Sequence, residues 1–111
     1  MLSPSERRQA IIEAISERRY ETIDNLALEF SVCRNTIKRD LTIISSSVPL
    51  YTVKGRTGGV RAHEDWYASK EYLTKEQELL LSEILPHLDI EREYIMRSII
   101  DKYRMPRVTG K

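Results

Sequence analysis

The chain has 111 residues, of which 41% are hydrophobic, and its 18 Lys and Arg residues against 17 Asp and Glu residues give a formal net charge of +1. That length accommodates one small domain with an appendage and excludes a usual enzyme fold built around a deep cleft. The single cysteine excludes an internal disulfide, and without a signal peptide or an apolar run near the roughly 20 residues of a membrane helix the protein is expected to be cytoplasmic.

A first helix is predicted to begin at Pro4. Ser3 stands where an N-cap residue belongs, and Glu6 follows three residues later, which completes a capping box. Arg7 and Arg8 in the first turn are expected to be solvated rather than to touch phosphates. The isoleucines of this helix should close a three-helix core with the two helices that follow; they are Ile11, Ile12 and Ile15.

The stretch from residue 23 to residue 41 is predicted to form two short helices joined by a tight turn. Thr22 is the expected N-cap of the first helix, and apolar residues recur at helical spacing on one side of each helix. After Phe30, residues 31–33 are too few for anything but a sharp turn before a second apolar set resumes, which indicates a helix-turn-helix. The apolar positions are Ile23, Leu26, Ala27 and Phe30 in the first helix and Ile37, Leu41 and Ile44 in the second.

The second of these helices carries a polar, basic face. Steps of about 100° per residue place this face opposite Ile37 and Leu41. Arg and Lys can pair with guanine and Asn with adenine in a DNA major groove, although a plain solvated face fits this helix alone equally well. We expect base-edge contacts from Asn35, Lys38, Arg39 and Thr42, and backbone contacts near the helix start from Arg34 and Thr36.

Residues 49 to 62 are predicted to form a β-hairpin with a glycine-rich tip. Glycines supply the positive φ angles that a reversing chain needs, and Lys54 and Arg56 give the tip positive charge. These two side chains are expected to contact phosphates or the minor groove. The rival interpretation, a phosphate cradle for a nucleotide, fails because neither a GxGxxG run nor a GK[ST] ending precedes a helix here.

The charge is unevenly distributed along the chain, which matters more than its near-zero sum. Between residues 33 and 61 a single acidic residue, Asp40, stands against six basic ones. The rest of the chain after this stretch is slightly acidic. The asymmetry favours a local positive footprint on the predicted DNA-binding face. The six basic residues are Arg34, Lys38, Arg39, Lys54, Arg56 and Arg61.

On these features, residues 6 to 62 resemble the winged helix-turn-helix of DeoR-type bacterial transcription regulators. The resemblance rests on residues 7–12, on the turn at residues 26–32, on the TIKRDL block at residues 36–41, which follows the family's Thr-Ile-Arg-Arg-Asp-Leu signature, and on Gly58-Gly59. It implies a mainly α fold with a small β-hairpin, and transcription regulation through double-stranded DNA. Cys33 replaces a Ser that commonly caps the family's recognition helix, so we expect a weaker cap.

The spacing from Pro49-Leu50-Tyr51 to Gly58-Gly59-Val60, followed by residues 73–77, is similar to the N-terminal part of regulators that continue into a WYL-type effector domain. Up to Lys111 there is no room for such a domain, or for the sugar-phosphate-binding domain of DeoR regulators. The resemblance therefore implies no cofactor and leaves any small-molecule effector unknown.

The C-terminal part is predicted to form two further helices. Thr74 and Gln77 make a capping box for one that Pro86 should end, and the other should run from near Asp89 to about Tyr103. Their apolar residues either pack back on the first domain or, as we favour, against a second chain, because bacterial operators are usually two-fold sites. On the second helix the expected stripe comprises Ile90, Tyr94, Ile95, Ile99 and Tyr103.

The sequence thus predicts a winged helix-turn-helix DNA-binding domain at residues 1–62, and a linker with a helical homodimerisation segment at residues 63–111. No catalytic or metal-binding residues are predicted, because His63 and His87 are isolated and lack metal-ligand spacing. Two alternatives stay open. The winged helix is either a protein-interaction module that meets an acidic partner, or the head of a longer effector-sensing regulator.

Overall fold

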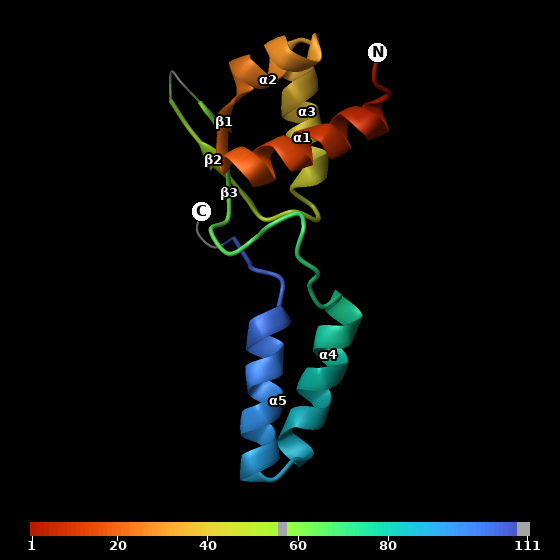
Figure 1. Ribbon diagram of the computed structural model, residues 1–111, viewed down its shortest axis with the longest axis vertical. Coiled ribbons are helices and arrows are strands. Elements are labelled where there is room, and N and C mark those ends of the chain that lie inside the picture. The colour runs from red at the N-terminus through yellow and green to blue at the C-terminus, as the bar shows by residue number, and fades with distance from the viewer. Residues whose placement is uncertain (56–57, 109–111) are drawn as a thin grey trace. The chain divides into compact units, whose positions relative to one another are not determined.

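The computed structural model describes residues 1–55 and 58–108 and divides the chain into two compact units (Figure 1). The first, the winged unit, comprises residues 1–68 together with residues 106–108. The second, the helical hairpin, comprises Ser69–Met105. In the part of the chain that the structure describes, no helix combines the length and the apolar sequence that crossing a bilayer takes.

Helix α1 (Pro4–Arg18) begins as predicted. The hydroxyl of Ser3 accepts a hydrogen bond from the Glu6 N–H at 3.1 Å, and the Glu6 carboxylate accepts one from the Ser3 N–H at 2.9 Å. The hydrogen bond from the Ser3 N–H, together with the nearby Ser3 hydroxyl, lowers the pKa of the Glu6 carboxylate. At the other end, Arg19 adopts a left-handed conformation with a φ of 71° and turns the chain out of the helix.

The small sheet is antiparallel in the order β1-β3-β2, from strands β1 (Tyr20–Thr22), β2 (Leu50–Val53) and β3 (Gly59–Ala62). Strands β2 and β3 confirm the predicted hairpin. Strand β1 was not predicted, because three residues are too few to show alternation and its partner lies far along the chain. Gly59 is required where the two meet, since a Cβ there would lie 2.4 Å from the Glu21 carbonyl oxygen.

Helices α2 (Ile23–Phe30) and α3 (Arg34–Ile44) form the predicted helix-turn-helix. The Thr22 hydroxyl caps α2 by accepting from the Asn25 N–H at 3.1 Å. Ser31, at a φ of 55°, ends α2 and turns the chain toward α3. The core that α1 closes over these helices has four fully buried side chains, those of Ile11, Ile15, Leu26 and Ile37.

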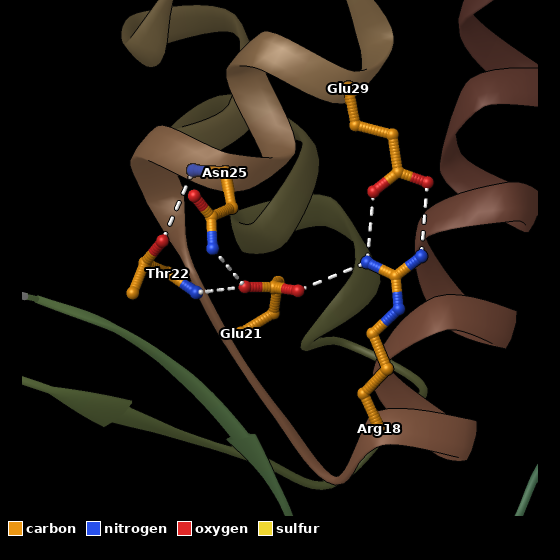
Figure 2. Close-up of polar contacts among 5 residues, drawn as sticks. All are labelled: Arg18, Glu21, Thr22, Asn25 and Glu29. Carbon is orange, nitrogen blue, oxygen red and sulfur yellow. Dashed lines mark hydrogen bonds and ion pairs between the residues drawn. The ribbon is translucent and has the colours of Figure 1, made fainter.

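An ion-pair network joins the end of α1 to β1 and α2 (Figure 2). The Arg18 guanidinium donates to Glu29 at 2.8 and 3.1 Å and to Glu21 at 3.0 Å. Burial raises the pKa of Glu21, but hydrogen bonds from Asn25, from the Thr22 N–H and from Arg18 outweigh burial and hold this pKa below its usual range. The hydrogen bond from Arg18 likewise lowers the pKa of Glu29. The network therefore holds the end of α1 and strand β1 against α2, the first helix of the helix-turn-helix.

This network predicts a pH-dependent stability. A carboxylate whose pKa is lower in the folded state stabilises the fold above its unfolded pKa, and this contribution is lost as the pH falls through the folded value. Glu29→Gln should therefore lower the free energy of unfolding at about pH 7, and the difference from the wild type should vanish as the pH falls through the lowered folded pKa of Glu29. Urea unfolding of both proteins across this range checks the prediction, and a difference that stays constant with pH would contradict it.

The helical hairpin contains α4 (Lys75–Ile84), the 3-10 helix η1 (Leu85–His87) and α5 (Ile90–Tyr103). Its two long helices run antiparallel, side by side (Figure 1). The capping box of Thr74 and Gln77 is confirmed, and Asp89 caps α5 by accepting from the Arg92 N–H at 2.8 Å. Within the helical hairpin, Ile100 is the buried residue of α5.

The predicted apolar stripe on α5 is wrong. Steps of about 100° per residue put Ile90 and Ile99 on opposite sides of the helix, so the five residues cannot share one stripe. The partly buried Met96 and the buried Ile100 mark the side that faces α4. All five residues of the expected stripe are exposed.

Candidate nucleic-acid interface

One side of helix α3 faces the core, and the opposite side faces solvent. Ile37 and Ile44 are buried at 0% and 3% exposure, and Leu41 is half-buried. The polar residues that we expected on the other side are exposed, except Thr36, which is half-buried. The exposed ones are Arg34, Asn35, Lys38, Arg39 and Thr42.

Lys38 and Arg39 are the cations of α3 that remain available to a ligand. Neither side chain forms an ion pair or a side-chain hydrogen bond with the residues that the structure describes. They are neighbours on an exposed helix surface that carries no acidic residue, since the one carboxylate of α3, Asp40, is buried. An anionic ligand would therefore meet two uncompensated positive charges here.

Arg34 differs from this pair, because its guanidinium donates to the carboxylate of Asp24 on α2. Both side chains are exposed, and exposed ion pairs of this kind contribute little to stability. A phosphate can therefore replace Asp24 at small cost. In the structure, however, Arg34 bridges the two helices of the helix-turn-helix instead of standing free.

The start of α3 has the weak cap that the sequence predicted. Cys33 occupies the N-cap position, and its side chain makes no capping hydrogen bond. Instead its Sγ lies 3.2 Å from the Thr36 hydroxyl, and the hydrogen bond with this hydroxyl lowers the pKa of the Cys33 thiol. Further along, the exposed Thr42 donates its hydroxyl to the Lys38 carbonyl at 3.0 Å.

A buried ion pair that the sequence analysis missed anchors α3 to α1. Asp40, only 2% exposed, accepts from the Arg7 Nε at 2.6 Å and Nη2 at 3.1 Å, and from Arg8 at 3.4 Å. The hydrogen bond to Asp40 raises the pKa of Arg7. The expectation that Arg7 and Arg8 are simply solvated is therefore wrong. One signal was available, because Asp40 follows Ile37 by three residues and so lies on the core side of the helix.

The hairpin of β2 and β3, which we call the wing, supplies a further cation. Lys54 is exposed directly after β2. The glycines shape the turn as predicted, since Gly55 has a φ of 119° and accepts a hydrogen bond from the Gly58 N–H at 3.0 Å. The predicted contact residue Arg56 lies outside the described residues.

Nothing in the described residues resembles a metal centre, since no group of three or more His, Cys, Asp or Glu side chains is placed to hold an ion. In a comparison with protein families, residues 7–63 match a family described as the DeoR-like helix-turn-helix domain. No curated protein and no solved structure matches the chain. The matched residues contain all of α2 and α3, the sheet, and the Asp40 ion pair.

Proposed function

Because the chain belongs to the DeoR-like helix-turn-helix family, we propose that it regulates transcription by binding a specific sequence of double-stranded DNA with α3. The observation that carries this proposal is that Lys38 and Arg39 are exposed on α3, outside its buried side, and form no ion pair with the described residues. Binding chromosomal DNA would place the protein in the cytoplasm.

The position of each side chain on α3 determines whether it contacts bases or the phosphate backbone. Arg39 and Lys38 reach guanine edges, and Asn35 and Thr42 contact neighbouring bases. Arg34 and Thr36, at the helix start, contact the phosphate backbone. On the wing, Lys54 and Arg56 add contacts to phosphates or to the minor groove, which strengthen binding without reading the sequence.

Selection from a random duplex library tests this proposal. We expect the full chain to enrich one motif, and its affinity for the winning duplex to fall steeply with salt as phosphate contacts release counterions. An enriched motif with a steep salt dependence supports sequence-specific regulation. No enrichment would contradict it and would favour a protein-interaction module.

We further propose that the helical hairpin forms a homodimer, so that two copies of α3 meet two half-sites. The support comes from four large apolar side chains that stay exposed. Steps of about 100° per residue put both members of each pair, Leu80 with Ile84 and Ile95 with Ile99, on one side of their helix. The exposed fractions are 57% for Leu80, 38% for Ile84, 58% for Ile95 and 44% for Ile99.

Both pairs border the contact between α4 and α5 on the same flank. On each helix, the apolar pair is rotated by about the same angle, in the same sense along the chain, from the side that faces the other helix. Because the two helices run antiparallel, both pairs then point to the same face of the helical hairpin. The four side chains therefore form one apolar surface. Exposed apolar surfaces of this kind mark interaction sites. A second copy of the same surface is a suitable occupant, because a two-fold axis pairs identical patches and buries both.

Sedimentation of two single variants tests the dimer. Ile95→Glu should convert a wild-type dimer to a monomer at micromolar concentration, because a charge would enter the apolar interface. Its neighbour Tyr94, exposed on another side of α5, provides the matched control, and Tyr94→Glu should leave the dimer intact. A monomeric wild type, or equal dissociation of both variants, would contradict this interface.

A further inference from the structure

A second site is indicated by a cavity of about 500 Å³ that opens to solvent beside the sheet of the winged unit. Its volume falls within the range of small-molecule sites. Among the residues that the structure describes, none of those proposed to contact DNA lines this cavity. The lining residues are Arg19, Tyr51, Arg61, Ala62, Glu64 and Tyr67.

Arg19 gives the cavity a fixed positive charge. Its guanidinium donates to three backbone carbonyls, which hold the group in place without neutralising it. Tyr67 packs against the same guanidinium, with the Tyr67 ring centroid 4.1 Å from the Arg19 Cζ. The three acceptors are the carbonyl oxygens of Ser16 at 2.7 Å, His63 at 2.8 Å and Trp66 at 2.7 Å.

Arg61 gives the cavity a second, exposed positive charge. It forms no ion pair with the residues that the structure describes, and its Cζ lies 5.6 Å from the centroid of Tyr51, its cross-strand neighbour. The lining residues include one carboxylate, that of Glu64, against the two guanidinium groups. The balance of charge therefore favours an anionic ligand.

The aromatic side chains at the cavity favour a ligand that contains a flat ring. Tyr51 stacks on His63, with the two ring centroids 5.8 Å apart and the ring planes at 22°. Tyr51 of this pair lines the cavity next to Arg61, and both an aromatic face and a guanidinium plane can stack on a planar ring. A simple inorganic anion would use only the cations and would leave this surface unoccupied.

We propose that this cavity binds a small anion that carries a flat aromatic ring, of the size of a nucleoside monophosphate. The anionic group pairs with Arg61 and approaches Arg19, and the ring lies against Tyr51. The proposal goes beyond DNA binding and does not depend on it, because it uses other residues. It gives the winged unit a ligand site of its own.

Titration of the isotope-labelled full chain, followed by NMR, tests the proposal with three probes. We expect adenosine monophosphate to shift the amide signals of residues 61–67 in a saturable manner, and adenosine or inorganic phosphate alone to bind at least about tenfold more weakly. No saturable shift with adenosine monophosphate at millimolar concentration would overturn the proposal. Equal affinity for inorganic phosphate would overturn it too, because the ring would then contribute nothing.

Two variants identify the residues responsible. Arg61→Gln should raise the Kd of adenosine monophosphate at least about tenfold, whereas Lys75→Gln, which removes one exposed cation from α4, should leave it unchanged. Tyr51→Leu should reduce the affinity to that of inorganic phosphate. Unchanged signals from the core isoleucines show that each variant is folded. Equal weakening by Arg61→Gln and Lys75→Gln would reveal general charge attraction and would overturn the assignment.

Discussion

Replacing Asp40 with alanine is expected to lower the free energy of unfolding by about 3–5 kcal/mol, because it leaves a buried cation without its partner. The Arg7 side chain is only 13% exposed and donates two hydrogen bonds to Asp40. Without the carboxylate, Arg7 must either stay buried and unpaired or move into solvent and pull α1 away from α3. Both outcomes cost free energy, and the second also changes the orientation of the face proposed to contact DNA.

Urea unfolding measures this effect, with Asp24→Ala as the matched control. Asp24 also pairs with an arginine, Arg34, but both side chains of this ion pair are exposed, so its loss should cost less than about 1 kcal/mol. If Asp40→Ala were no more destabilising than Asp24→Ala, the buried ion pair would not anchor α3.

Replacing Arg39 with alanine is expected to weaken DNA binding by about 1–3 kcal/mol and to relax specificity at one base pair, because a base-edge contact is lost. Lys54→Ala should act differently. A phosphate contact carries no sequence information, so this variant should weaken binding to all duplexes alike and flatten the salt dependence by about one counterion.

Fluorescence anisotropy on the selected duplex and on its single-base variants, at several salt concentrations, distinguishes the two effects. Both side chains are exposed cations of the winged unit, so each variant serves as the control for the other. An identical loss of affinity on every duplex tested would contradict the division into base and phosphate contacts.

The helix boundaries could be predicted because their signals are local. Ser3, Thr22, Thr74 and Asp89 each cap a helix through a backbone N–H three residues away. Such a contact needs no knowledge of the rest of the fold. Strand β1 escaped prediction for the opposite reason, since its three residues become a strand only by pairing with β3, far along the chain.

The exposed side of α3 could also be predicted, because a periodic apolar set determines which residues point outward. The ion pairs could not. Asp40 meets Arg7 across 33 positions of sequence, and Arg34 meets Asp24 through the turn between two helices. Such partners become neighbours only when the helices pack, which the sequence pattern alone does not specify.

The most direct test of the account is the affinity of a double charge reversal, Lys38→Glu with Arg39→Glu, for the selected duplex. We expect a loss of at least about a hundredfold, because two attractive contacts become repulsive, with the thermal unfolding transition retained. The matched control, Lys70→Glu with Lys75→Glu, changes the net charge equally on exposed residues outside the winged unit and should leave the affinity within about threefold of the wild type. If the reversal on α3 weakened binding no more than this control, the exposed face of α3 would not be the surface that binds DNA.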